Sequence, residues 1–210
     1  NPVDITFEQG RFQIAGTDRS LSFTEVVAAA YNPIAFPPTE IEPGMEETTY
    51  FDPPDFTFPY GCHLGEVEVD PDTGKVEILA LAAVDDFGVQ MNPMIVAGQI
   101  HGGLAQGIGQ ALFEHCVFDK QSGQLLSGSL MDYALPRASD LPAMRIESVT
   151  TPCRNNPLGV KGCGEAGAIA GPAALVSAVL HALEPLGVTR IDMPVTAEKL
   201  WRACQGAGHP

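Results

Sequence analysis

The chain has 210 residues, enough for one large domain or two smaller ones with a buried core. Acidic residues outnumber basic residues 26 to 11, and the resulting net charge of −15 argues against binding to a nucleic acid or an anionic membrane. The five cysteines show no Cys-x-x-Cys spacing, so we expect free thiols and neither a disulfide framework nor a zinc site.

The chain shows no clear targeting or membrane-spanning segment. Its first residues, Asn1-Pro-Val-Asp4, lack the charged start and apolar stretch of a signal peptide. The only apolar run near membrane length, residues 166–183, is mostly alanine and contains Pro172 and His181. We interpret this run as a buried helix and expect a soluble, cytoplasmic protein without a membrane span.

Residues 1–59 are expected to form an amino-terminal strand–helix segment followed by an acidic, proline-rich arm. Residues 5–8 and 11–14 are typical of a short hairpin, and Ser22 or Thr24 could cap a helix over residues 25–31. The density of prolines in residues 32–59 excludes a persistent helix or a central strand. This arm either links two domains or wraps over a larger partner.

Residues 60–210 are expected to form a second, larger domain. Strands and helices alternate there without strict βαβ repetition, which favours an α+β fold with mixed sheets, hairpins and packed helices. The pattern predicts a hairpin of 63–70 and 75–81, a helix from Asn92-Pro93 through His115, a hairpin turning at 121–123, a strand over 144–149, a helix from Pro172, a strand near 188–191 and a short helix over 194–201.

Within the helix predicted from Asn92-Pro93 through His115, residues 97–112 contain five glycines. Each costs about 1 kcal/mol relative to alanine in a helix interior. Its apolar stripe is opposite a side rich in glycine and amides. That side suits a flat polar ligand that approaches the backbone closely. It equally suits close helix packing through small residues, with the glutamines solvated. The apolar stripe is Ile100, Leu104, Ile108 and Leu112, and the opposite side is Gln99, Gly102, Gln106, Gly109 and Gln110.

A second unusual segment, Asn156-Pro-Leu-Gly-Val-Lys-Gly-Cys-Gly-Glu-Ala-Gly167, sets one carboxylate in a glycine-rich turn before a helix. Glycines there indicate a positive φ or a backbone that something else approaches closely. Glu165 is therefore a candidate general base. The alternative is a glycine turn with a solvated glutamate.

These two segments, together with Met131-Asp-Tyr-Ala-Leu-Pro136, resemble corresponding blocks of the molybdenum hydroxylases. This family comprises the large subunits of xanthine dehydrogenase, aldehyde oxidoreductase and aerobic carbon monoxide dehydrogenase. Residues 191–201 are similar to the carboxyl-terminal end of these subunits. The resemblance covers nearly all of the chain, and its blocks occur in the family's order.

The resemblance implies roles for individual residues. Glu165 matches the family's active-site glutamate, the base toward a hydroxyl ligand on molybdenum; the activated oxygen attacks the substrate carbon while hydride leaves to a sulfido ligand. Gln106 matches a glutamine that hydrogen-bonds the pterin. An amide suits that role because it can both donate and accept a hydrogen bond. Lys161, with the backbone at Gly162 and Gly164, matches the loop that lines the metal site. Gly103 and Gly107 would let the helix approach the cofactor.

Family members are much longer than this chain, which matches their carboxyl-terminal, molybdopterin-binding portion. The resemblance thus implies a molybdopterin cofactor, in its cytosine dinucleotide form, shared with the remainder of the large subunit. It also implies iron–sulfur and FAD-containing partner subunits, a small-molecule substrate and a possible homo-oligomer. We expect this chain alone to be inactive.

Other functions are open at this point. Gly162-Cys-Gly-Glu-Ala-Gly167 has the G-x-G-x-x-G spacing of an NAD-binding dehydrogenase, although a poor strand precedes it. A non-catalytic assembly module, with Glu165 merely structural, is another alternative. A hydrolase that uses Glu165 lacks a partner carboxylate or nucleophile at a recognisable spacing.

The remaining polar residues are given structural interpretations. The five histidines are too scattered to predict a protein-ligated metal. Asp85-Asp86 is interpreted as a strand-end turn with solvated or hydrogen-bonded carboxylates. Cys163 is expected to be a packing thiol, and His101 could contact a cofactor phosphate.

Overall fold

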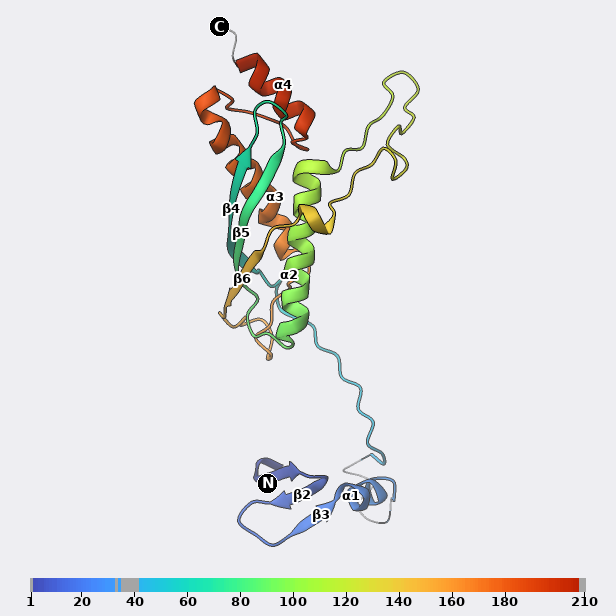
Figure 1. Ribbon diagram of the computed structural model, residues 1–210. Coiled ribbons are helices and arrows are strands. Elements are labelled where there is room, and N and C mark those ends of the chain that lie inside the picture. The colour runs from blue at the N-terminus through green and yellow to red at the C-terminus, as the bar shows by residue number, and fades with distance from the viewer. Residues whose placement is uncertain (1, 33, 35–41, 208–210) are drawn as a thin grey trace. The chain divides into compact units, whose positions relative to one another are not determined.

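The computed structural model describes residues 2–32, 34 and 42–207, so residues 35–41 of the expected proline-rich arm lie outside the described residues. The chain forms two compact units, residues 1–52 and 53–210. Both contain helices and strands, and the expected α+β fold is confirmed (Figure 1). The elements of the first unit are η1 (Pro2–Asp4), β1 (Ile5–Glu8), β2 (Arg11–Ile14), β3 (Ser20–Ser22) and α1 (Phe23–Ala30). Those of the second are β4 (Tyr60–Val69), β5 (Val76–Asp86), α2 (Pro93–Ile108), η2 (Gly109–Phe113), η3 (Ala138–Asp140), β6 (Met144–Val149), α3 (Ala166–Leu183), η4 (Glu184–Leu186) and α4 (Ala197–Ala207).

The first unit is an antiparallel sheet, in the order β1-β2-β3, followed by helix α1. The helix starts where the sequence predicts, because Ser22 and Glu25 form a reciprocal capping box. The strand register places the apolar side chains on one face of the sheet, which pairs Ile5 with Ile14 and Phe7 with Phe12. No residue among the described part of this unit is fully buried, so the apolar face has no complete cover within the unit.

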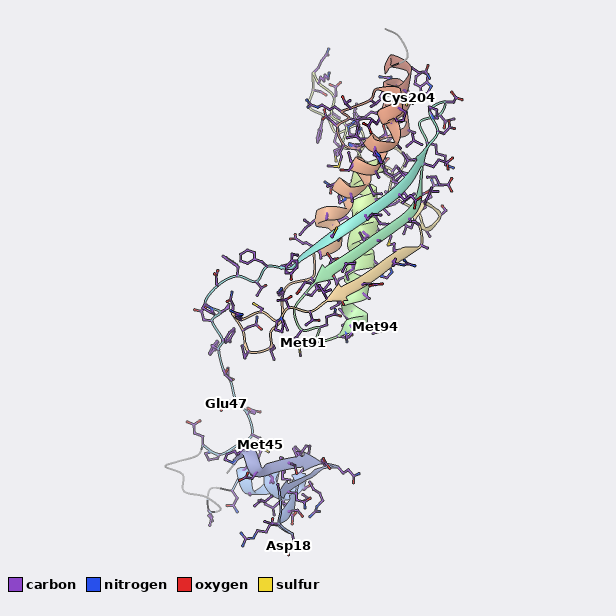
Figure 2. The ribbon with its side chains drawn as sticks, turned by 90° about the vertical axis from the view of Figure 1, so that its left-hand side faces the viewer. Asp18, Met45, Glu47, Met91, Met94 and Cys204 are labelled. Atoms are coloured by element: carbon purple, nitrogen blue, oxygen red, sulfur yellow. The ribbon has the colours of Figure 1, made fainter. Side chains whose placement is uncertain are left out.

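The second unit is built on a mixed sheet in the order β4-β5-β6. Strands β4 and β5 form the expected antiparallel hairpin, whereas β6 runs parallel to β5 after the α2 crossover. Helices α2 and α3 cover the same face of this sheet (Figure 2). The core between them is formed by apolar side chains of β5, α2 and α3. Its most deeply buried members include Leu81, Phe87, Ile100, Leu104, Ile108, Leu175 and Val179.

Helix α3 is long and apolar enough to cross a membrane by length and composition alone. In this structure it packs along α2 and β4, with Leu175, Val179 and Leu183 buried in the core. The buried helix expected over the apolar run 166–183 is confirmed over Ala166–Leu183, and the narrower expectation that the helix begins at Pro172 is wrong. Proline is tolerated inside it because its ring faces α2 at Gly107, and the contact with α2 stabilises this stretch.

The last part of the chain differs from the expected order of elements. No strand forms over the described residues 188–191; Val188 is buried in the core, 7 % exposed, and Ile191 packs against the core partly buried. The helix expected over 194–201 is observed as α4, which begins at Ala197 and extends to Ala207. Leu200 and Cys204 of α4 are buried against the core, so tertiary packing extends this helix beyond the expected end. Figure 2 shows Cys204 at the end of the unit opposite to Met91 and Met94.

Candidate active site

The glycine-rich loop that precedes α3 is fastened to the end of strand β5 by its own backbone. Gly88 and Val160 form an antiparallel bridge, and the Lys161 amide donates to the Phe87 carbonyl at 2.9 Å. The Asn156 side chain closes the loop internally, because it donates to the Val160 carbonyl at 2.9 Å and accepts from the Val160 amide at 3.0 Å. The loop conformation is therefore fixed up to Lys161.

A buried ion pair adds a second attachment at the same point. Lys161 Nζ lies 2.8 Å from Asp86 Oδ1, and the two side chains are 8 % and 0 % exposed. The Gly88 amide donates to the same carboxylate oxygen at 2.8 Å. The Lys161 ammonium also lies 4.7 Å from the centre of the Tyr60 ring, a favourable cation–π arrangement. The charge of Lys161 is thus directed into the protein, toward Asp86.

The surroundings of Asp86 hold its carboxylate in the ionised form. Burial on its own would raise the pKa of Asp86, but the hydrogen bonds to its carboxylate, of which that from Lys161 contributes most, together outweigh burial, and the pKa lies well below its ordinary value. The Thr151 hydroxyl, the Gly88 amide and the Tyr60 hydroxyl contribute to the lowering. The second carboxylate oxygen, Asp86 Oδ2, has no hydrogen-bond partner of good geometry among the described residues. The Tyr60 and Thr151 hydroxyls instead hydrogen-bond each other at 3.0 Å. Lys161 is therefore the main charge partner of Asp86.

Glu165 is the last residue before helix α3 and occupies its N-cap position. Its carbonyl accepts from the amides of Ala168 and Ile169 at 2.9 and 3.1 Å, which starts the helix. Its side chain is exposed and makes no hydrogen bond or ion pair within the described part of the chain. The carboxylate is therefore available to a ligand, and the burial that would suit a general base is not supplied by this chain.

Gly162 and Gly164 lie in the short stretch between Lys161 and Glu165. Both are exposed, and a Cβ at either position would meet nothing within 4 Å. Neither has a positive φ, so backbone strain does not require glycine there. The Gly162 amide contacts the Thr57 hydroxyl at 3.4 Å. The open backbone on this stretch allows close approach by a partner or ligand.

Helices α2 and α3 cross through glycine. A Cβ at Gly103 would lie 2.9 Å from the Gly167 Cα, and one at Gly107 would lie 3.0 Å from Pro172 Cδ. Gly103 and Gly107 are therefore buried at the contact of α2 with α3. They lie away from the exposed side of α2, so they allow the close approach of α3 to α2. The crossing brings the start of α3, and with it the end of the glycine-rich loop, against the middle of α2.

The outer side of α2 carries the amide side chains that the sequence singled out. Gln99, Gln106 and Gln110 are all exposed, and a Cβ at Gly102 would meet nothing within 4 Å. No hydrogen bond of these three amides to another described residue is observed. His101 on the same helix hydrogen-bonds the Ala97 carbonyl through Nδ1, at 2.8 Å. A flat polar ligand on this side would meet unpaired amides and bare helix backbone.

The sequence places Asp85 and Asp86 at a strand-end turn with solvated or hydrogen-bonded carboxylates; the hydrogen-bonded alternative is observed, and the turn and the solvated alternative are wrong. Both residues are the last of strand β5, and their side chains are buried because each has a cationic or imidazole partner. Asp85 contacts His63 Nε2 at 3.1 Å, with side chains only 5 % and 1 % exposed, and His63 Nδ1 has no partner among the described residues. Sequence reasoning missed these pairs. The available signal was two acids directly after the apolar run of β5.

The structure also limits two other interpretations. A dinucleotide fingerprint must follow directly on a strand, but β6 ends at Val149 and an irregular loop separates it from Gly162. The G-x-G-x-x-G spacing is therefore not a nucleotide-binding turn. Within the described residues, no cluster of three or more His, Cys, Asp or Glu side chains could hold a metal ion. Cys163 is half-buried and packs against the core.

Comparison with known proteins is consistent across sequence and structure. A family model described as the molybdopterin cofactor-binding domain matches residues 1–142. The carbon monoxide dehydrogenase large chain of Hydrogenophaga pseudoflava is 38 % identical over 203 residues, and the nicotine 6-hydroxylase large subunit of Paenarthrobacter nicotinovorans is 40 % identical over 204. Each match covers 97 % of this chain and 25 % of the relative, so the chain spans about a quarter of their length.

Solved structures show the same relationship. Quinoline 2-oxidoreductase from Pseudomonas putida 86 superposes with a TM-score of 0.88 at 41 % identity, covering 98 % of this chain and 26 % of that one. Its similarity extends over both compact units of the chain.

Proposed function

The chain belongs to the molybdopterin cofactor-binding domain family, and we propose that it holds molybdopterin and supplies Glu165 as a base in a molybdenum hydroxylase large subunit. The observation that carries this proposal is the glycine crossing of α2 and α3. It sets the exposed, unpaired Glu165 at the end of a loop packed against the helix whose outer side carries Gln99, Gln106 and Gln110. A base and a row of cofactor-binding amides thus belong to adjoining elements.

The residues present fit a pterin. The pterin edge needs groups that donate and accept hydrogen bonds, and the free amide of Gln106 provides both. Gly102 and Gly98 beside it leave open space for a flat ring, whereas Gly103 and Gly107 contribute indirectly by setting the helix packing. The open backbone at Gly162 and Gly164 would line the site from the loop. When bound, the cofactor supplies the redox chemistry by accepting the electron pair that leaves the substrate.

The contribution of Glu165 is proton transfer. An ionised carboxylate within hydrogen-bond reach can take a proton from a water-derived hydroxyl group as that oxygen attacks an electron-poor carbon. Lys161 keeps its ammonium on Asp86, so its proposed part in the site is to hold the loop, and the loop backbone faces the cofactor. Exclusion of water from Glu165 would come from the cofactor, the substrate and the remainder of the large subunit.

The proposed partners follow from the relatives. Because the chain spans about a quarter of their length, we propose that the remainder of a large subunit completes the site. The names of the relatives cover carbon monoxide, nicotine and xanthine as substrates, which supports a small-molecule substrate without selecting one. Iron–sulfur and flavin subunits would take the electrons onward, the cofactor would be the cytosine dinucleotide form, and the assembly would be cytoplasmic.

Cofactor retention tests the binding half of this proposal. In the assembled enzyme, Gln106→Ala should lower the pterin and molybdenum bound per large subunit, because the pterin loses a two-way hydrogen-bond partner. Gln121→Ala, at an exposed turn of the Phe118–Leu125 hairpin, serves as the matched control and should retain full cofactor. Equal cofactor content in both variants would contradict a cofactor contact at Gln106.

One observation favours a second candidate, a non-catalytic assembly module. The Glu165 side chain is exposed and unpaired among the described residues, as expected for a glutamate whose only role is to precede the first turn of α3. In this alternative, substitution of Glu165 leaves turnover of the assembled enzyme unchanged.

A further inference from the structure

We propose that Asp86 is a positioning residue for Glu165 and acts through Lys161. The inference rests on the proposed role of Glu165 as a base. It concerns Asp86 at the end of strand β5, which hydrogen-bonds neither to Glu165 nor to the amide side chains of α2.

The segment that carries Glu165 is restrained between its ends mainly by the Cys163 side chain, which packs against the core, and by the contact of the Gly162 amide with the Thr57 hydroxyl at 3.4 Å. Between Lys161 and Glu165 the sequence is Gly-Cys-Gly, and both glycines are free of steric contact. Glycine has the widest conformational choice of all residues, so this stretch is poorly fixed by its own backbone. The orientation of Glu165 therefore depends on what holds the two ends. One end is α3, which begins at Ala166, and the other is Lys161.

Asp86, in contrast, is held rigidly. It is the final residue of β5, with Tyr60 of β4 on one side and Val149 of β6 on the other. Its side chain is fully buried, and Oδ1 is oriented by the Gly88 amide at 2.8 Å. A site built on a strand is held more precisely than one built on a loop.

The link between the two is the ion pair at 2.8 Å, which fixes the ammonium end of Lys161 to the sheet. Backbone bonds to Phe87 and the Gly88–Val160 bridge hold the loop up to Lys161 but do not fix its side chain. Without the carboxylate, the Lys161 cation would be buried with no counter-charge and would be driven toward solvent. That movement would strain the hydrogen bond from the Lys161 amide to the Phe87 carbonyl, loosen this end of the glycine stretch and so displace Glu165.

The adjacent residue offers a matched control. Asp85 is also buried at the end of β5, and it also has a buried partner, His63, at 3.1 Å. His63 lies on β4, so this pair joins two strands of the sheet, and neither of its side chains hydrogen-bonds to the described residues 156–165. Asp85→Asn and Asp86→Asn therefore both remove a buried charge from neighbouring positions, and only the second removes an ion-pair partner of the loop.

Two measurements test the inference. Hydrogen–deuterium exchange of the 210-residue chain should show faster exchange of the hydrogen-bonded amides of Lys161, Ala168 and Ile169 in Asp86→Asn, because the last two donate to the Glu165 carbonyl, with β4 and β5 still protected and no such change in Asp85→Asn. In the assembled enzyme, Asp86→Asn should lower kcat roughly 10- to 100-fold, at unchanged molybdenum content, while Asp85→Asn leaves kcat unchanged. If Asp86→Asn does not fold, the charge-free double variant Asp86→Leu with Lys161→Met replaces it; it removes the same link to the sheet without leaving a buried charge, so the amides of Lys161, Ala168 and Ile169 should again exchange faster than in the unmodified chain.

The outcomes separate this inference from the proposed function. Unchanged exchange of the Lys161, Ala168 and Ile169 amides, or an equal loss of kcat in the Asp85 and Asp86 variants, would overturn the positioning role and leave Glu165 as the base. The role of Glu165 as the base is tested separately by Glu165→Gln, which should abolish turnover without changing the hydrogen–deuterium exchange of these three amides. If Glu165→Gln retains turnover, the proposed function fails, while the exchange result still reports whether Asp86 holds the loop.

Discussion

Gly103 of α2 and Gly167 of α3 touch backbone to backbone, so that a Cβ at Gly103 would lie only 2.9 Å from the Gly167 Cα. The crossing positions the start of α3, and therefore Glu165, against α2. Few pairs of residues other than glycine permit such an approach.

Gly103→Ala should destabilise the chain by about 1–3 kcal/mol, because overpacking forces the two helices apart. The neighbouring Gly102→Ala is the control: its Cβ meets nothing within 4 Å, and alanine should stabilise the helix by about 0.5–1 kcal/mol. Urea unfolding curves of both variants give the comparison. Equal stability of the two variants would show that the helices do not cross at Gly103.

Lys161→Met should cost roughly 3–5 kcal/mol of unfolding free energy, because it leaves the Asp86 carboxylate buried without a counter-charge. The exposed pair of Arg202 and Glu198 on α4 is the control, with side chains 70 % exposed. Arg202→Met should change stability by less than about 0.5 kcal/mol. A small effect at Lys161 would mean that its ammonium is not buried on Asp86.

The same pair gives the chain a defined response to acid. Because the pKa of Asp86 is lowered in the folded state, its contribution to stability is present above the ordinary aspartate pKa of about 4 and is lost as the pH falls toward the lower folded value. Asp86→Asn should therefore flatten the loss of unfolding free energy below about pH 5. Denaturant unfolding at a series of pH values measures this slope, and parallel curves for the two proteins would refute it.

Tyr133 and Glu114 provide a test at alkaline pH. The Tyr133 hydroxyl donates to Glu114 Oε2 at 2.5 Å, and this hydrogen bond, with burial and the glutamate charge, raises the pKa of Tyr133 to about 12. Any stability it contributes is present below the ordinary value of about 10 and is lost as the pH rises through 12. Glu114→Gln should bring the pKa of Tyr133 back toward 10.

Titration of tyrosinate absorbance follows that change, and Tyr133→Phe identifies the component that belongs to this residue. A Glu114→Gln protein that titrates like the unmodified chain would contradict the hydrogen bond. The pair ties the end of the α2 region to the Met131–Pro136 segment, one of the blocks that carry the family resemblance.

Local signals account for the parts of the fold that the sequence predicts well. The capping box of Ser22 and Glu25 starts α1, and Asn92-Pro93 starts α2 with the Asn92 side chain on the Ile95 amide at 3.2 Å. The hairpin of β4 and β5 follows from alternation and a turn at Gly74, whose φ is +71°. These elements depend on residues close in the sequence.

The parts that the sequence does not predict depend on distant contacts. Pro172 lies inside α3 where Gly107 leaves room for its ring, and Val188 and Ile191 contact the core from an irregular segment without forming a strand. Within the candidate site, Glu165 and Gln106 are identified by their motifs. The partnership of Asp86 with Lys161, which are 75 positions apart, is visible only once the chain is folded.

The most direct test of the account is turnover of the assembled enzyme with Glu165→Gln, measured together with its molybdenum content. An amide cannot take a proton from the attacking oxygen, so we expect turnover to fall to background while molybdenum content stays near that of the unmodified enzyme. Glu198→Gln, an exposed control on α4, should behave as the unmodified enzyme. Near-normal turnover in Glu165→Gln at full molybdenum content would contradict the assignment of Glu165 as the base.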